Sequence, residues 1–293
     1  MTESAPDESR LERLLHEIAQ LRAEVGDLSQ RLDALVGPRP DPVVGLNDHP
    51  TSNLSARDRH LLTVQIPREL EASLQLFRHF SPTELMPPSG DWALSPLGLL
   101  EITRTIQADQ PATVVECGSG TSSVWFGMAV SQYGGQVYSL EHDSVYAERT
   151  RSMVERHGLH NHVTVLHAPL TEYTREDETL TWYQSDELLA TGLTIDLLLI
   201  DGPPSSSAGD RAHTLKILAD HLSPDAWVFV DDYVRESERQ MVDLWRTEYP
   251  ELRRIPSTTK QLAILRRQEA DVAAPPFETE TPDNSEPTTS GAS

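Results

Sequence analysis

The fold is decided by ten residues, 113–122, which read Thr-Val-Val-Glu-Cys-Gly-Ser-Gly-Thr-Ser. The first half, Thr113 to Cys117, is typical of a buried strand, and Thr121 begins a helix predicted to end near Gln132. The glycine turn between them lets the backbone approach a ligand closely, and the free N–H groups of a helix start favour electron-rich groups. The stretch therefore predicts a nucleotide-type binding loop. The alternative is a plain strand-to-helix turn whose glycines only avoid clashes.

The kind of nucleotide is indicated by the residues around the turn. A dinucleotide fingerprint would place its third glycine at position 123, where this chain has Ser123. Glu116 lies two residues before the first glycine, where its carboxylate would repel a pyrophosphate. The same carboxylate could accept hydrogen bonds from a cationic ligand that carries an amino-acid group.

From residue 113 onward strands and helices alternate, which indicates a parallel α/β sheet. The predicted strands are 113–117, 136–140, 162–166, 195–200 and 226–230, followed by a strand pair, 251–255 and 261–265, with no helix between its members. The predicted helices are 69–80, 96–108, 121–132, 144–157, 211–221 and 236–248. In the first of these helices Leu70, Leu74 and Phe77 share one apolar face.

Acidic residues follow several of the predicted strands. In an open parallel sheet ligands bind beyond the carboxyl ends of the strands, so these groups are expected on one rim. Glu141 lies 23 residues after Gly118, close to the spacing at which an acidic residue hydrogen-bonds ribose hydroxyls. The alternative is that Glu141 is a solvated acid before a helix and that Asp143 is the helix N-cap.

Four motifs in this order resemble the class I S-adenosylmethionine (SAM)-dependent methyltransferases, in particular a subgroup that methylates hydroxyls of small molecules and sugars. They are Val-Val-Glu-Cys-Gly-Ser-Gly-Thr-Ser-Ser (114–123), Ser-Leu-Glu-His-Asp (139–143), Leu-Ile-Asp-Gly-Pro-Pro (199–204) and Val-Asp-Asp-Tyr (230–233). The resemblance covers roughly residues 92–267 and implies a Rossmann-like sheet of seven strands, mostly parallel with the last strand antiparallel, and helices on both faces. Ser122 stands where the first motif has its last glycine.

The resemblance also implies a cofactor site. Glu116 and the turn residues Gly118, Ser119, Gly120, Thr121 and Ser122 would hold the amino-acid part of SAM. Glu141, with His142 beside it, would hold the ribose, and the segment near Ala168 would hold the adenine. Asp201 is placed in the same site.

Related O-methyltransferases bind a divalent cation with acids after the fourth and fifth strands, which in this chain are Asp201, Asp231 and Asp232. Three hard oxygen ligands suit Mg²⁺, which could hold a substrate diol or lower the pKa of a hydroxyl. The chain has Pro204 where catechol-type O-methyltransferases have a lysine, so the sequence does not identify the general base. Asp201 and His213 are the catalytic candidates, and Arg211 is a candidate substrate clamp. Alternatively, these side chains only support neighbouring loops.

Composition limits the partners. The 293 residues carry a formal net charge of −22, which repels phosphate backbones and anionic membranes and disfavours nucleic-acid substrates. The only cysteine is Cys117, so no intrachain disulfide can form. The N-terminus lacks the layout of a signal peptide, and no apolar run approaches the roughly 20 residues of a membrane helix. We expect a soluble, cytoplasmic protein.

The sequence predicts four segments: a coiled-coil helix (8–36), a Pro-rich linker (37–57), a methyltransferase domain (58–267) and a disordered acidic tail (268–293). The heptad positions are filled by Leu11, Leu14, Ile18, Leu21, Val25, Leu28, Leu32 and Leu35, a pattern typical of a parallel dimer. We expect a homodimer or binding to a partner through this helix. The alternative is an amphipathic helix packed on its own chain.

Together these features predict an enzyme that transfers a methyl group from SAM to a hydroxyl of a small molecule or sugar by in-line displacement, with Mg²⁺ as a candidate assistant. Two other functions stay open: a non-catalytic coiled-coil adaptor with a degenerate methyltransferase domain, and an NAD-dependent oxidoreductase. The acceptor is not encoded in a general pattern, because specificity lies in loops such as 171–194 and 203–210. Trp182 and Tyr183 could stack on an acceptor there or only cover the core.

Overall fold

The computed structural model describes residues 55–89, 92–175, 178–204, 207 and 209–268. The chain divides into two units at Arg59 and His60, and the second unit contains the whole central sheet. The predicted coiled coil lies outside the described residues, as do all of the linker except its last three residues and all of the acidic tail except its first. No helix in the described ranges has the length and apolar content needed to cross a membrane.

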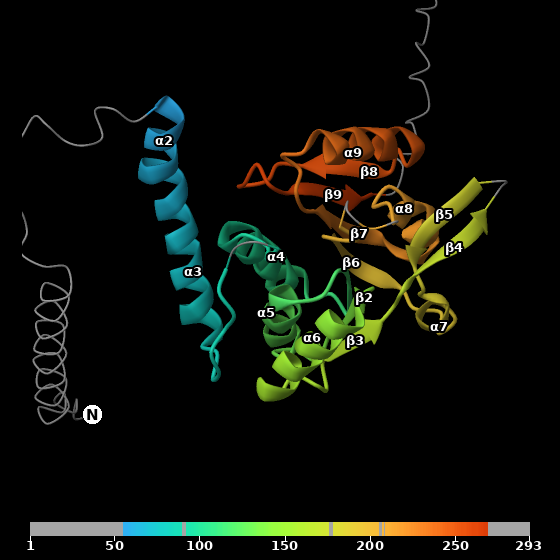
Figure 1. Cartoon of the computed structure of the whole chain (residues 1–293), viewed down its shortest axis with the longest axis horizontal. Coiled ribbons are helices and arrows are strands. Elements are labelled where there is room, and N and C mark those ends of the chain that lie inside the picture. The colour runs from blue at the N-terminus through green and yellow to red at the C-terminus, as the bar shows by residue number, and fades with distance from the viewer. Residues whose placement is uncertain (1–54, 90–91, 176–177, 205–206, 208, 269–293) are drawn as a thin grey trace, which may run out of the picture. The chain divides into compact units, whose positions relative to one another are not determined.

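A seven-stranded sheet forms the centre of this unit (Figure 1). Its strands in chain order are β1 (Thr113–Cys117), β2 (Gln136–Glu141), β3 (Val163–His167), β6 (Ile195–Ile200), β7 (Leu222–Val230), β8 (Leu252–Ile255) and β9 (Ala263–Arg267). The spatial order is β3-β2-β1-β6-β7-β9-β8. The first five are parallel, and β9 runs antiparallel to both β7 and β8. The predicted fold class is therefore confirmed.

Helices cover both faces of the sheet because each strand alternates its apolar side chains between two cores. On one face α4 (Pro96–Asp109), α5 (Thr121–Val130) and α6 (Ser144–Arg156) pack on residues such as Val114 and Val137. On the other, α8 (His213–Leu218) and α9 (Glu236–Glu248) pack on residues such as Val115 and Leu198. Ser95 caps α4 by accepting from the N–H of Gly98 at 3.1 Å, with Pro96 in the first turn, as the sequence indicated.

The segment before α4 is helical. It consists of α2 (Ala56–His60), a π-helical turn (Leu61–Gln65) and α3 (Ile66–Phe80). α3 packs through Ala72 and Leu76, whereas Leu70, Leu74 and Phe77 are 59%, 62% and 48% exposed. Leu70 and Leu74 of the predicted apolar face are therefore exposed, whereas the Phe77 ring contacts the core residue Trp125, with ring centroids 5.4 Å apart.

The connection between β3 and β6 differs most from the prediction. Instead of an irregular loop it contains a two-stranded antiparallel hairpin, β4 (Leu170–Arg175) and β5 (Glu178–Tyr183), followed by the short helix α7 (Asp186–Leu189). Trp182 and Tyr183 end the second strand and are both fully buried. Both side chains belong to the core, as one of the two alternatives proposed, and Tyr183 also forms part of a cavity wall.

Candidate active site

The glycine turn connects β1 to α5 at the carboxyl edge of the sheet. Gly118 has φ +98°, a conformation that favours glycine, and its N–H donates to the Leu140 carbonyl at 2.8 Å. The N–H of Gly120 donates to the Ser123 hydroxyl at 3.1 Å. A Cβ added at Gly120 would meet no protein atom within 4 Å, so the turn leaves open space in front of the helix start.

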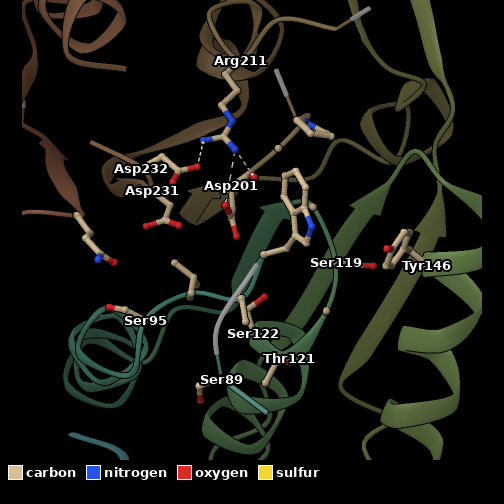
Figure 2. A pocket seen from close by; sticks show the side chains of 18 of the residues that line it. Ser89, Ser95, Ser119, Thr121, Ser122, Tyr146, Asp201, Arg211, Asp231 and Asp232 are labelled. Carbon is tan, nitrogen blue, oxygen red and sulfur yellow. Dashed lines mark hydrogen bonds and ion pairs between the residues drawn. The ribbon is translucent and has the colours of Figure 1, made fainter. Parts of the chain in front are cut away.

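A cavity of about 740 Å³ opens over this turn. It brings together eleven residues that the sequence analysis assigned to the site: Gly118, Ser119, Gly120, Thr121, Ser122, Glu141, His142, Asp201, Arg211, Asp231 and Asp232. Figure 2 shows the side chains of Ser119, Thr121 and Ser122 from the turn and those of Asp201, Arg211, Asp231 and Asp232. Other parts of the wall come from the residues that lead into α4, such as Trp92 and Ser95, and from the segment after β7, such as Val234. The cavity therefore lies where parallel α/β sheets bind ligands.

Glu141 connects the end of β2 to the glycine turn. Its Oε2 accepts from the N–H and the hydroxyl of Ser119 at 3.1 and 3.2 Å, and its Oε1 accepts from the Asp143 N–H at 3.0 Å. The side chain is buried, while Asp143 caps α6 through the N–H groups of Val145 and Tyr146. Asp143 is therefore the N-cap of α6, as the alternative interpretation proposed. Glu141, however, is buried and not solvated.

Glu116 does not line the cavity. It is fully buried on β1, where its carboxylate accepts hydrogen bonds from the hydroxyls of Ser122 (2.8 Å), Ser123 and Ser139. Burial raises the pKa of Glu116 to about 7, against the opposing effect of the three serine hydroxyls. The prediction that Glu116 contacts the ligand is therefore not supported, because its acceptor sites already hold the turn and the start of α5 on the sheet.

Three carboxylates meet where β6 and β7 end. Asp201, Asp231 and Asp232 each offer an oxygen within 4.8 Å of the others. Burial and the nearby Asp231 raise the pKa of Asp201 well above its usual range, and burial raises the pKa of Asp231 to about 6. The cluster therefore brings three carboxyl groups to one end of the cavity, where the neutral form of Asp201 is favoured.

Arg211 lies among these carboxylates with its side chain 9% exposed (Figure 2). Its guanidinium donates to the Asp232 carboxylate at 3.1 Å, to the Asp201 carbonyl at 2.7 Å and to the Pro203 carbonyl at 3.1 Å, and lies 3.5 Å from the Glu238 carboxylate. These contacts occupy the guanidinium, so the structure does not support the prediction that Arg211 clamps a substrate. It joins the loop after β6 to the loop after β7.

The spacing of the three carboxylates suits a shared cation, but the neighbouring charges do not. Mg²⁺ binds oxygen at about 2.1 Å. An ion on Asp232 Oδ2 would therefore lie no more than about 5 Å from Arg211 Nη1, which is 3.1 Å from that oxygen. At an effective dielectric constant of about 20, this repulsion amounts to roughly 6 kcal/mol. Arg235 Nη1, 2.8 Å from the same oxygen, adds to it, so the residues present do not fit Mg²⁺ as the sequence suggested.

Comparison with known proteins identifies the kind of domain that contains this cavity. A family model described as "Methyltransferase domain" matches residues 115–233, the part of the chain from β1 to the segment after β7. The chain carries a class I methyltransferase domain. No curated protein sequence matches the chain.

Solved structures resemble the methyltransferase domain at low sequence identity. An SAH-bound methyltransferase from Podospora anserina aligns with a TM-score of 0.50 and 15% identity over 71% of this chain and 97% of its own. A methyltransferase from Geobacter sulfurreducens aligns with a TM-score of 0.47 and 16% identity over 73% and 97% of the two chains. The O-methyltransferase TomG from Streptomyces achromogenes aligns with a TM-score of 0.45 and 16% identity over 73% of this chain and 100% of its own. At these identities the likeness concerns the fold.

Two further predicted site residues, besides Glu116, lie outside the cavity wall. Ala168 is fully buried and its N–H donates to the Glu141 carbonyl at 2.7 Å, so it supports the end of β2 and does not itself line the cavity. His213 Nδ1 lies 3.2 Å from the Thr181 carbonyl, so its imidazole contacts the hairpin strand β5. This contact does not support a role for His213 as general base.

Tyr183 is a cavity residue for which the sequence left contact with an acceptor and packing in the core as alternatives. It lines the cavity from the end of β5, yet its hydroxyl is buried and has no hydrogen-bond partner among the described residues. Gly202 makes room for this hydroxyl, because a Cβ there would lie 2.2 Å from the Tyr183 oxygen. No local signal could have placed it, since its position depends on the cross-strand pairing of β5 with β4.

Two tyrosines of the hairpin should respond in opposite ways to removal of the hydroxyl. Tyr183→Phe removes an unpartnered buried group, so we expect unchanged or higher stability, by up to about 1 kcal/mol. Tyr173→Phe should cost about 1–2 kcal/mol, because the Tyr173 hydroxyl accepts from the Ser185 N–H at 3.1 Å and donates to the Tyr183 carbonyl at 3.1 Å. Urea unfolding of both variants measures the difference. Equal losses would mean that the Tyr183 hydroxyl has a partner in solution.

Proposed function

We propose that this methyltransferase domain binds SAM in the cavity and transfers its methyl group to a hydroxyl of a small molecule, with sugar hydroxyls among the acceptors. The observation that carries the proposal is the cavity itself: the glycine turn and the buried Glu141 form its wall and are joined by the hydrogen bond from Ser119 to Glu141. The resemblance in fold to an SAH-bound methyltransferase supports the choice of cofactor.

Within this proposal the turn residues Gly118 to Ser122 hold the amino-acid part of SAM. Glu141 holds the ribose, and a ribose hydroxyl would take the place of the Ser119 hydroxyl, which has a second partner in Thr150 at 3.0 Å. Glu141 and Asp231 are carboxylates of the cavity wall, which suit a sulfonium cofactor. A dinucleotide would instead bring its pyrophosphate toward these carboxylates, which disfavours the oxidoreductase alternative.

The proposed reaction is an in-line displacement at the sulfonium methyl carbon. The acceptor oxygen forms a bond to the methyl carbon while the carbon–sulfur bond breaks and its electron pair stays on sulfur, which leaves SAH. The hydroxyl proton passes to a base, and Asp231 is a carboxylate of the cavity wall that is placed to accept it. Most of the rate enhancement would come from holding the two reactants in line.

Thermal unfolding with and without nucleotides tests the cofactor proposal. SAH at 100 times its Kd should add about 2.7 kcal/mol of stability. For a domain of this size we expect Tm to rise by roughly 5–10 °C. NAD⁺ at the same concentration should leave Tm unchanged. A rise with NAD⁺ alone would support the oxidoreductase, and no rise with either ligand would support the adaptor.

Glu141→Gln should weaken SAH binding by at least about tenfold, or 1.4 kcal/mol. The amide presents N–H groups where the carboxylate accepts from Ser119 and where the ribose hydroxyls would bind. Glu148→Gln is the control, because Glu148 is an exposed residue of α6 that pairs with Arg151 and does not line the cavity. The experiment compares the SAH concentration that gives half of the maximal Tm shift. Equal concentrations for wild type and Glu141→Gln would remove Glu141 from the ligand site.

Self-association through residues 8–36 and a cytoplasmic location remain proposals based on the sequence. Both are compatible with a small-molecule enzyme whose cofactor site is contained in one domain. Sedimentation of the full chain at several concentrations tests the dimer.

A further inference from the structure

Two arginines contact the acidic cluster that ends β6 and β7. Arg235 Nη1 lies 2.8 Å and Arg211 Nη1 lies 3.1 Å from the same oxygen, Asp232 Oδ2. Both arginines also approach the Glu238 carboxylate, at 3.6 and 3.5 Å. Asp232 is therefore the acid of the cluster with the closest arginine contacts, and Arg211 Nη2 also lies 3.8 Å from Asp201 Oδ1.

Arg211 also connects the segments that a metal ion would connect if it bound all three carboxylates. It contacts the carbonyls of Asp201 and Pro203 after β6, the carboxylate of Asp232 after β7, and Glu238 on α9. A planar guanidinium is suited to such a position because it presents five donors in a fixed geometry and stays charged. The loops at this end of the cavity are thus tied together by a side chain of the protein.

We propose that Arg211 and Arg235 take the place of a divalent cation at this cluster, so that the domain holds its acidic site without a metal. Arg211 and Arg235 are positioning residues: they fix Asp232 and the loop after β6, and they leave the Asp231 carboxylate on the cavity wall to face a cationic group of the ligand. The identity of that ligand rests on the proposed function, whereas the test below uses a metal ion alone and does not depend on SAM.

Binding of Mn²⁺ to the metal-stripped full chain, followed by electron paramagnetic resonance, tests the proposal. Asp231→Asn identifies signal that belongs to the cluster. We expect no cluster-specific binding by wild type at Mn²⁺ concentrations up to about 1 mM, a range in which one or two carboxylates alone hold such ions weakly. Arg211→Gln, which removes the central guanidinium, should bind Mn²⁺ at least tenfold more tightly than wild type, and the double variant Arg211→Gln/Asp231→Asn should lose this gain.

Arg235→Gln is the second variant, to be used if Arg211→Gln does not fold. The Arg235 side chain is 42% exposed, so its replacement should leave the fold intact. It should also gain Mn²⁺ affinity. Arg239→Gln is the matched control. Arg239 lies in α9, four residues after Arg235 at the N-cap, but pairs with Glu236 at 2.6 Å. Micromolar Mn²⁺ binding by wild type that Asp231→Asn abolishes would overturn the proposal. So would equal Mn²⁺ affinity in wild type, Arg235→Gln and Arg211→Gln.

Discussion

Replacing Arg211 by Met is expected to lower the free energy of unfolding by about 3–5 kcal/mol, the usual loss when one partner of a buried ion pair is removed. Methionine fills part of the same volume, so the loss arises mainly from charge. Without the guanidinium, Glu238 keeps Arg235, 3.6 Å away, as its cationic partner, and two backbone carbonyls lose this donor. Glu238 is itself buried and cannot be hydrated in compensation.

Urea unfolding at neutral pH measures this loss, and Arg239→Met is the control. Arg239 pairs with Glu236 on the exposed side of α9, where an ion pair contributes at most about 1 kcal/mol. We therefore expect a several-fold larger effect at position 211. A loss below 1 kcal/mol for Arg211→Met would show that the acidic cluster does not depend on this guanidinium for stability.

Glu116→Gln is expected to change how stability depends on pH. The pKa of Glu116 is raised from 4.5 to about 7 in the folded protein, chiefly by burial. Between these values the folded state binds more protons than the unfolded state, so the contribution of Glu116 is fully present below pH 4.5 and is lost as pH rises through 7. A shift of this size corresponds to about 3 kcal/mol over the whole interval.

Unfolding of wild type and Glu116→Gln at pH 5 and pH 8 measures this effect. Glutamine stays neutral and can still pair with the hydroxyls of Ser122, Ser123 and Ser139. The variant should lose less stability than wild type between the two pH values, by roughly 2–3 kcal/mol. Glu148→Gln, which changes an exposed carboxylate, should behave like wild type. Parallel pH profiles for wild type and Glu116→Gln would contradict the raised pKa.

The sheet could be predicted from sequence because most of its strands are short apolar runs bounded by turn residues or helical patterns. Thr113–Cys117 and Ile195–Ile200 have the predicted bounds, and the strand pair at the end has the predicted antiparallel arrangement. The glycine turn and Glu141 could be placed for a related reason. Parallel strands end at one edge, so residues at strand ends share a site whatever the details of packing.

The roles of Glu116 and Arg211 could not be predicted, because they depend on contacts between distant segments. Glu116 is neighbour to Ser139 only through the register of β1 and β2. Arg211 reaches Asp232 only because the loop after β6 folds toward the end of β7. Sequence spacing predicts which residues lie at the edge of the sheet. It does not predict whether the charge of such a residue is accessible to a ligand or paired with another side chain.

Calorimetric titration of SAH into wild type and Gly120→Ala tests the central claim, that the glycine turn forms the wall of a SAM site. Gly120 lines the cavity, and a Cβ there would meet no protein atom within 4 Å, so the substitution should leave urea stability within about 0.5 kcal/mol of wild type. We predict SAH binding by wild type and at least tenfold weaker binding by Gly120→Ala, because the methyl group would occupy space that the ligand needs. Absence of SAH binding by the stable wild-type protein, or equal affinity for both proteins, would contradict the account.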